Sequence, residues 1–320
     1  AKGDGTTDDY AAIQAAITAV VTAGTYSIYL PAGVYIVTGT LTWPEDNDDG
    51  YNYAGSMYGD GAADINTMDD DGTPEGLLRF NTGTVIKHEP TVPSTHCIVD
   101  NPGRLNVRDL SIIGNSSTGN PTDGSNVGIL IGNGGTVSAG GSGALIERVF
   151  VYGCLFGISI LYNGPDGVSI NNSTLQKNGT GLAIGGSSHA VTVVGTRISN
   201  SSSGVPNFAK YGVRLGYSAD DGSKPVTATF IGCDIERSSV LQVDIQEALC
   251  ATFIGCYFEG GRYTDQSSQI MRIAADHTDS AWSRSITIQS CYFNGLYVVD
   301  PPAVAGNGDG TSWLIEFGAI

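Results

Sequence analysis

The chain has 320 residues, of which 41% are hydrophobic, and a formal net charge of −17 at pH 7. This acidic balance argues against nucleic acids and anionic membranes as partners, and no apolar run approaches the roughly 18 residues that a membrane span needs. The 45 glycines follow no triplet period, so they predict turns in a single elongated domain rather than collagen.

The first predicted element is a helix within the segment GDGTTDDYAAIQAAI, residues 3–17. Thr7 or Asp8 is expected to cap it, and acidic residues in its first turn suit the helix dipole. Gly24 is expected to end it. Such a helix would cover the open end of a solenoid, where backbone groups are otherwise unpaired. Its apolar stripe is predicted to consist of Ala12, Ile13, Ala16, Ile17 and Val20.

Two acidic segments follow, Glu45–Asp49 and Asp69–Asp71, and a third acidic loop lies at Asn307–Asp309. Carboxylate oxygens bind calcium, but the first two segments lack the EF-hand spacing. Solvated loops are therefore the favoured interpretation. No cofactor is expected, and structural calcium is the alternative.

From residue 110 onward a short apolar cassette recurs seven times, at intervals of 39, 24, 23, 37, 23 and 35 residues. A unit near 23 residues recurs, and the longer intervals contain insertions. Periods of this size are typical of solenoids, in which each repeat stacks on the next. The cassettes begin at Leu110, Val149, Ser173, Thr196, Cys233, Cys256 and Cys291.

Each cassette is accompanied by further segments rich in Val and Ile, which alternate apolar and polar residues and are separated by Gly, Asn, Ser or Asp. This pattern predicts three short strands per coil, and hence an all-β, right-handed parallel β-helix with a short N-terminal capping helix. An antiparallel sandwich is the alternative, but it gives no reason for Phe-Ile-Gly-Cys to recur at 230–233 and 253–256.

A single domain is expected, divided into an N-terminal cap (1–40), first coils with acidic insertions (41–105), regular coils (106–300) and a C-terminal strand or tail (301–320). The apolar ending predicts a partner surface or a further domain. Cys233, Cys256 and Cys291 share one inward position, which favours a stack of free thiols over disulfides or a metal site.

Alternation along the strands assigns outward positions. If Cys233 points inward, Asp234 and Glu236 point outward, and Glu259 does so one coil later. Glycoside hydrolysis needs two carboxyl groups, about 5–5.5 Å apart for retention and about 6.5–9.5 Å for inversion. Asp234, Glu236 and Glu259 are therefore the predicted catalytic residues, and solvated surface is the alternative.

Neighbouring side chains are candidates for binding substrate. Tyr257 and Tyr292 are predicted to stack against sugar rings. Arg214, Asp244 and Arg272 form an outward ladder that either binds an acidic sugar or is a structural ion-pair stack. Lys210 and Tyr217 lie in an insertion beside the same coils, and Lys210 or a tyrosine is a possible base for a lyase.

The N-terminal motif resembles that of the pectate-lyase-like β-helix superfamily, especially phage tailspike depolymerases. The resemblance implies a capping role for the motif, a homotrimer, and an extracellular or virion-tail location; no signal peptide is visible in this chain. The matching residues are Gly3, Asp4, Gly5, Thr7, Asp8, Asp9, Ala11, Ala12, Ile13, Gln14, Leu30 to Gly33 and Tyr35.

Relatives of this kind include hydrolases, lyases and non-catalytic binders. The expected function is endo-hydrolysis of a bacterial surface or extracellular polysaccharide. A polysaccharide lyase and a non-catalytic glycan-binding or structural spike are the alternatives. The net charge of −17 would repel an anionic glycan and so favours a neutral or mixed one.

Overall fold

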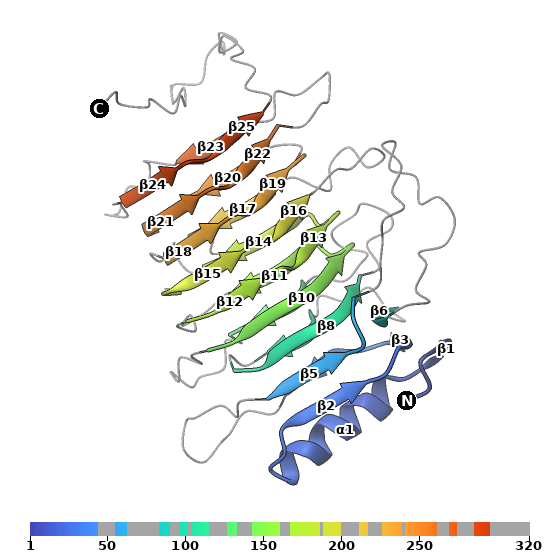
Figure 1. Ribbon diagram of the computed structural model, residues 1–320. Helices are drawn as coiled ribbons and strands as arrows, with labels where there is room; N and C mark the ends of the chain where they lie inside the picture. The colour runs from blue at the N-terminus through green and yellow to red at the C-terminus, as the bar shows by residue number, and fades with distance from the viewer. Residues whose placement is uncertain are drawn as a thin grey trace, which may run out of the picture.

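The computed structural model describes residues 1–43, 55–62, 83–89, 97–101, 104–114, 127–132, 143–160, 167–185, 188–199, 211–216, 226–238, 241–246, 248–260, 269–273 and 285–294. Within these ranges the chain forms one helix and a stack of short strands. The strands build coils that rise from the N-terminal end to the C-terminal end (Figure 1).

Each strand pairs in parallel with its equivalents in neighbouring coils, which gives three ladders. The first ladder contains β2 (Ser27–Leu30), β5 (Ser56–Gly59), the first halves of β8 (Asn106–Ile113) and β10 (Leu145–Tyr152), β12 (Ser169–Asn171), β15 (Val191–Val194), β18 (Val226–Ile231), β21 (Ala248–Ile254) and β24 (Ser285–Gln289).

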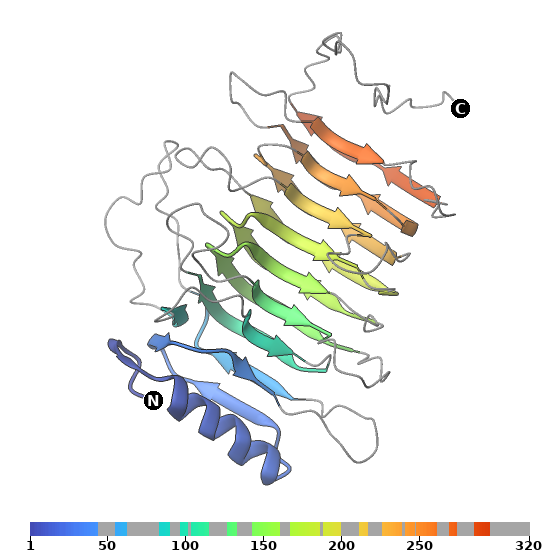
Figure 2. The ribbon, with the colours of Figure 1, turned by 180° about the vertical axis from the view of Figure 1, so that it is seen from behind.

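The second ladder contains β1 (Asp4–Asp8), β3 (Gly33–Val37), β6 (Thr84–His88), the second halves of β8 and β10, β13 (Thr174–Gln176), β16 (Arg197–Ser199), β19 (Asp234–Glu236), β22 (Tyr257–Glu259) and β25 (Tyr292–Asn294). The third contains β4 (Leu41–Thr42), β7 (Cys97–Asn101), β9 (Val127–Ile131), β11 (Phe156–Ile160), β14 (Thr180–Ile184), β17 (Tyr211–Leu215), β20 (Leu241–Ile245) and β23 (Gln269–Ile273). The predicted parallel β-helix is confirmed, and Figure 2 shows the same stack from behind.

The register that the cassettes predict is also confirmed. Leu110 pairs with Val149, and later coils continue the same alignment through Ile198, Ile235 and Phe258. Inward side chains form one continuous core, in which the rings of Phe258 and Phe293 stack with centroids 5.0 Å apart. Each coil thus buries its apolar side chains against the next.

Cysteines occupy the predicted inward column as free thiols. Cys233, Cys256 and Cys291 each donate to a backbone carbonyl of an adjacent coil, at 3.4–3.5 Å. Cys233 and Cys256 are buried and Cys291 is half-buried. The stack is therefore part of the core rather than a disulfide framework.

The helix α1 (Tyr10–Thr22) covers the N-terminal end of the stack, as Figures 1 and 2 show. Its N-cap is Asp9, so the prediction of Thr7 or Asp8 was wrong: residues 4–8 form β1 and pair with β3. The prediction of acidic residues in the first turn was wrong for the same reason. Gly24 follows the helix with φ 70°, as expected.

The buried side chains of α1 are Ile13 and Ile17, whereas Ala12 and Ala16 of the predicted stripe are exposed. The buried stripe is therefore narrower than predicted. No helix in the described ranges has the length and apolar character needed to cross a membrane.

The acidic N-terminal motif holds the cap together. The buried carboxylate of Asp9 accepts hydrogen bonds from the backbone N–H groups of Lys2, at 2.6 Å, and Gly3, at 3.0 Å. Gln14 exchanges two hydrogen bonds with the backbone of Thr42, at 2.8 and 2.9 Å. These contacts explain the motif structurally, without a catalytic role.

Replacing Asp9 by Ala is expected to lower the free energy of unfolding by about 1–3 kcal/mol, because two N–H donors lose a buried acceptor. Urea unfolding followed by circular dichroism measures the change. Asp8→Ala is the matched control, since Asp8 is exposed and its partners can bind water instead. A loss no greater for Asp9→Ala than for Asp8→Ala would contradict this account.

Candidate active site

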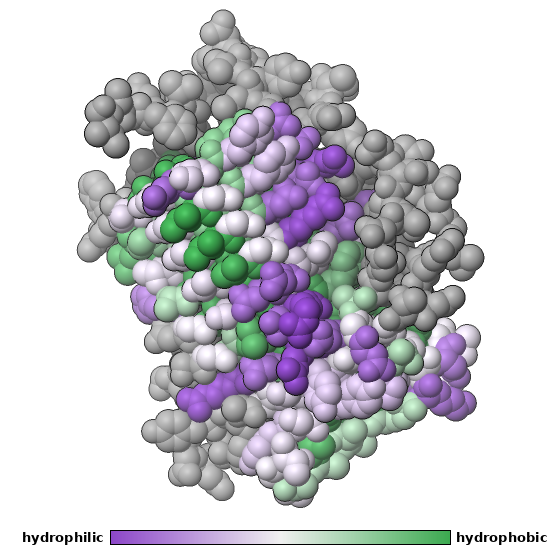
Figure 3. Space-filling model, viewed as in Figure 1, coloured by the Kyte–Doolittle hydropathy of each residue, from purple (hydrophilic) through white to green (hydrophobic). Residues whose placement is uncertain are grey.

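The outward face of the second ladder changes character along the stack. In the N-terminal coils it carries a buried apolar cluster that includes Val85, Ile113 and Phe150. From β16 onward the same face carries charged side chains, beginning with Arg197 beside Asp234. Figure 3 shows hydrophilic side chains gathered over β16, β19 and β22. The polar site therefore begins where the outward apolar packing ends.

Strand alternation positions the three predicted carboxylates. Ile235 and Phe258 are fully buried in the core, so the residues on either side of them point outward. Asp234 and Glu236 lie on β19, and Glu236 pairs in register with Glu259 on β22. The structure thus brings together Asp234, Glu236 and Glu259, as the sequence predicts.

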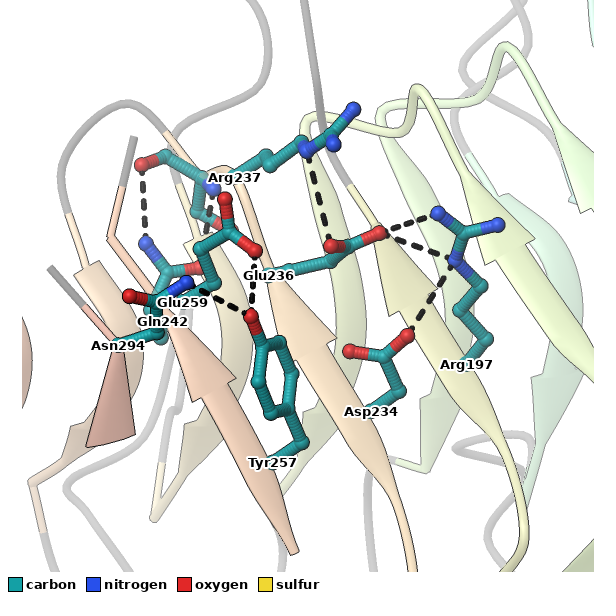
Figure 4. A network of polar contacts seen from close by, with 9 residues as sticks. Arg197, Asp234, Glu236, Arg237, Gln242, Tyr257, Glu259 and Asn294 are labelled. Carbon is teal, nitrogen blue, oxygen red and sulfur yellow. Dashed lines mark hydrogen bonds and ion pairs between the residues drawn. The ribbon is translucent and has the colours of Figure 1, made fainter. Parts of the chain in front are cut away.

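Glu236 lies between two guanidinium groups. Nε of Arg197 donates to Oε1 of Glu236 at 3.0 Å, and its Nη2 contacts the same oxygen. Nε of Arg237 lies 3.6 Å from Oε2 of Glu236 (Figure 4). Glu236 is only 4% exposed and Glu259 8% exposed. The side chains of Glu236 and Glu259 are therefore buried, in contrast to the solvated surface acids of the alternative interpretation.

Asp234 has a different environment. Burial, together with the negative charge of Glu236, raises the pKa of Asp234 to about 6, although Arg197 opposes the shift. Its Oδ2 lies 3.5 Å from Nε of Arg197. Its Oδ1 is buried, and no residue in the described ranges makes a hydrogen bond to it. The side chain as a whole is 38% exposed, so part of Asp234 reaches solvent although Oδ1 does not.

Tyr257 links the carboxyl group of Glu259 to the amide of Asn294. Its hydroxyl donates to Oε2 of Glu259 at 2.7 Å and accepts from Nδ2 of Asn294 at 2.9 Å. The hydrogen bond to Glu259 raises the pKa of Tyr257. The rings of Tyr257 and Tyr292 stack, with centroids 5.6 Å apart and planes 8° apart. Each ring covers one face of the other, and Tyr292 is the more exposed of the two.

This arrangement suits acid–base chemistry. Asp234 and Glu236 lie two residues apart on one strand, so their backbone positions are about 6.6 Å apart. Inverting hydrolysis needs carboxyl groups about 6.5–9.5 Å apart, and this separation depends on the two side-chain conformations as well as on the backbone. Asp234 has a raised pKa, whereas the carboxyl group of Glu236 contacts the guanidinium groups of Arg197 and Arg237. Asp234 and Glu236 thus lie in different surroundings, an arrangement that general acid–base catalysis uses.

Asp234→Asn is expected to stabilise the protein above about pH 6 by roughly 1 kcal/mol, a figure reduced because the side chain is partly exposed. A carboxyl group whose pKa is raised on folding favours the folded state below its unfolded pKa of 3.8, and this contribution is lost as the pH rises to about 6. Urea unfolding at pH 4 and pH 8 measures the change. An identical effect of the substitution at both pH values would contradict it.

The predicted row of charged side chains, Arg214, Asp244 and Arg272, lies on strands β17, β20 and β23 of the third ladder, in the predicted register. Arg272 binds the fully buried Asp244 through two hydrogen bonds, at 2.8 and 2.9 Å, and Nε of Arg214 lies 3.4 Å from Asp244. Arg214 also lies over the ring of Tyr211, 4.4 Å from its centroid. These contacts favour the interpretation of the row as a structural ion-pair stack, and binding of substrate by these three residues stays a prediction.

Several predicted positions lie outside the described residues. They are Lys210, Tyr217 and the possible calcium segments 45–49, 69–71 and 307–309. Within the described ranges, no group of three or more His, Cys, Asp or Glu side chains is arranged to hold a metal ion.

The structure adds Arg197, Arg237, Asn294 and Gln242 to the site (Figure 4). Arg197 shares an outward column with Asp234, so the register alone was enough to find it. Arg237 lies at the bend after β19, where strand alternation makes no prediction.

A sequence model described as rhamnogalacturonase A/epimerase, pectate lyase-like matches residues 1–206. No curated protein sequence matches the chain. Two solved structures share the fold. The A-module of mannuronan C-5 epimerase AlgE6 from Azotobacter vinelandii is 20% identical with a TM-score of 0.54, over 92% of this chain and 74% of that one. The enzymatically active domain of tailspike protein 2 from bacteriophage CBA120 is 11% identical with a TM-score of 0.50, over 91% of this chain and 40% of that one.

Proposed function

Since the chain belongs to the rhamnogalacturonase A/epimerase, pectate lyase-like family, we propose that it acts on a polysaccharide through the outward carboxyl cluster of β19 and β22. The favoured reaction is endo-hydrolysis of a bacterial surface or extracellular glycan. The observation that carries this proposal is the geometry of the cluster: Asp234 and Glu236 point outward from one strand, and both carboxyl groups contact Nε of Arg197, at 3.5 and 3.0 Å. The raised pKa of Asp234, about 6, supports its role as the acid.

In this reaction, protonated Asp234 donates its proton to the glycosidic oxygen as the bond from that oxygen to the anomeric carbon breaks. Glu236 removes a proton from a water molecule, whose oxygen attacks the anomeric carbon from the opposite face. The products are a free hydroxyl and a new reducing end. Asp234 is left ionised and Glu236 protonated, and proton exchange with water restores both. Arg197 contacts both carboxyl groups and orients them.

Incubation of the chain with a panel of neutral, mixed and acidic bacterial glycans tests the proposal. Mass spectrometry is expected to detect oligosaccharides that each carry one added water, and Asp234→Asn is expected to bind the same glycan without releasing them. Binding of a glycan by the wild type with no product after long incubation would overturn the enzymatic proposal and select a non-catalytic spike.

β-Elimination is the second candidate. The hydroxyl of Tyr257 can remove the sugar C5 proton if it passes its own proton to Glu259, which accepts its hydrogen bond at 2.7 Å, and the 49% exposed side chain of Arg197 offers a cation for a uronate carboxylate. Elimination gives an unsaturated product that absorbs in the ultraviolet. Tyr257→Phe is expected to abolish a lyase activity and to leave most of a hydrolase activity.

We also propose that the chain assembles as a homotrimer and works outside the cell or in a virion tail. An outward apolar strip on the first ladder supports self-association: Val194, Ile231 and Ile254 pair in register, Ile231 is 39% exposed, and the other two are half-buried (Figure 3). Light scattering with the wild type and Ile231→Asp tests the assembly. A wild-type monomer at all concentrations would contradict it.

A further inference from the structure

One position of the third ladder changes in the coil that carries the candidate active site. In four successive coils the second residue of the strand is glycine, and in β20 it is glutamine. A Cβ atom at Gly212 would lie 2.5 Å from the carbonyl oxygen of Gln242, so the glycine there is required by space. The column consists of Gly128, Gly157, Gly181, Gly212 and Gln242.

The side chain of Gln242 is fully buried, and among the residues that the structure describes it binds Ser238. Its Oε1 accepts a hydrogen bond from the N–H of Ser238 at 2.9 Å, and its Nε2 donates to the carbonyl oxygen of Ser238 at 3.1 Å. Both main-chain polar groups of Ser238 are thus held by a single amide. Ser238 belongs to the bend between β19 and β20, and Figure 4 shows Gln242 beneath this bend.

The residue before Ser238 is Arg237, which has a left-handed conformation with φ 59°. A residue with a Cβ atom is strained in this region, and such strain persists only where the surroundings impose it. The N–H of Arg237 donates to the carbonyl oxygen of Glu259 at 3.0 Å. Its side chain lies against Glu236, with Nε 3.6 Å from Oε2. The bend therefore determines whether this guanidinium reaches the carboxylate.

We propose that Gln242 is a positioning residue, which holds the main chain of Ser238 and thereby places Arg237 against Glu236. The inference rests on the proposed function, in which Glu236 is the base. Gln242 touches neither carboxyl group in this account, and it acts only through the bend.

Gln242→Met keeps the length of the side chain but cannot make both hydrogen bonds. It is expected to lower kcat by about 10- to 100-fold through displacement of Arg237, with little change in KM. Arg237→Ala is expected to have a similar effect, and the double variant no further effect, because Gln242 acts through Arg237. Additive effects of the two substitutions on kcat would overturn the proposal.

Asn178 provides a matched control. It is also fully buried, and its amide binds the backbone of the preceding coil: Oδ1 accepts from N–H of Cys154 at 3.0 Å and Nδ2 donates to the carbonyl oxygen of Val151 at 3.1 Å. Asn178→Leu is expected to lower Tm about as much as Gln242→Met and to leave kcat unchanged. Equal losses of kcat in both variants would reduce Gln242 to a structural residue.

A second measurement separates this inference from the proposed function. Arg237 lowers the pKa of Asp234, so Gln242→Met and Arg237→Ala are both expected to raise it, as measured by NMR titration of the Asp234 carboxyl carbon. This result needs no substrate. If the wild type cleaves no glycan but both variants shift the titration, the proposed function fails and the positioning role stands. An unchanged titration in Gln242→Met, with a shift in Arg237→Ala, would overturn the positioning role alone.

Discussion

Replacing Asp234 by Asn is expected to lower kcat by about 10²- to 10⁴-fold, because the leaving group loses its general acid. The amide keeps the size of the side chain, and it removes a carboxyl group whose burial raises its pKa to about 6. In the wild type, kcat/KM is expected to fall as the pH rises above about 6, since Asp234 then loses the proton that it must donate. In the Asp234→Asn variant, kcat/KM is expected to show no such fall above about pH 6.

Substrates with good leaving groups provide the control for this prediction. Aryl glycosides need little protonation of the departing oxygen, so Asp234→Asn is expected to retain far more activity on them than on the polysaccharide. An equal loss on both substrates would contradict the assignment of Asp234 as general acid, and a wild-type rate that rises steadily from pH 5 to pH 8 would do the same.

The second large effect is expected for Glu236→Gln, which removes the base that activates water. A loss of about 10²- to 10⁴-fold in kcat is expected. The negative charge of Glu236 also helps to raise the pKa of Asp234, so the substitution is expected to lower that pKa. The residual activity should therefore decline at a lower pH than that of the wild type. Steady-state kinetics from pH 4 to pH 8 measure both effects.

Glu259→Gln is the comparison for this variant, because Glu259 pairs in register with Glu236 and is equally an outward glutamate. The carboxyl group of Glu259 accepts a hydrogen bond from Tyr257, whereas that of Glu236 accepts from Arg197, so a smaller loss of hydrolysis is expected for Glu259→Gln. If Glu259→Gln is the more damaging of the two, the pairing of Glu236 and Glu259 across coils, as in a retaining enzyme, becomes the better assignment.

The coil register could be predicted from sequence because it follows from period-two alternation and from the spacing of the cassettes. Once Cys233 and Ile235 were placed inward, Asp234 and Glu236 had to point outward together, and the structure confirms this. The same reasoning is enough to place Arg197 in the column of Asp234, although its ionic contact with Glu236 depends on side-chain conformations that alternation does not determine.

The bends could not be predicted in the same way. Arg237 reaches Glu236 from a left-handed bend, and Gln242 holds that bend through Ser238. The replacement of glycine by glutamine in the strand cassettes was visible in the sequence, but its meaning required the position of Ser238. At the N-terminus, helix propensity extended α1 too far, since pairing of β1 with β3 competes for residues 4–8.

The anomeric configuration of the first product tests the central claim most directly. Proton NMR of a freshly started digest records the new reducing ends before mutarotation equilibrates them. With Asp234 as the acid and Glu236 as the base that activates water, the water attacks from the face opposite the leaving group, which predicts inversion at the cleaved centre. Products with retained configuration, or unsaturated products with no added water, would contradict the assignment of Asp234 and Glu236 as the hydrolytic pair.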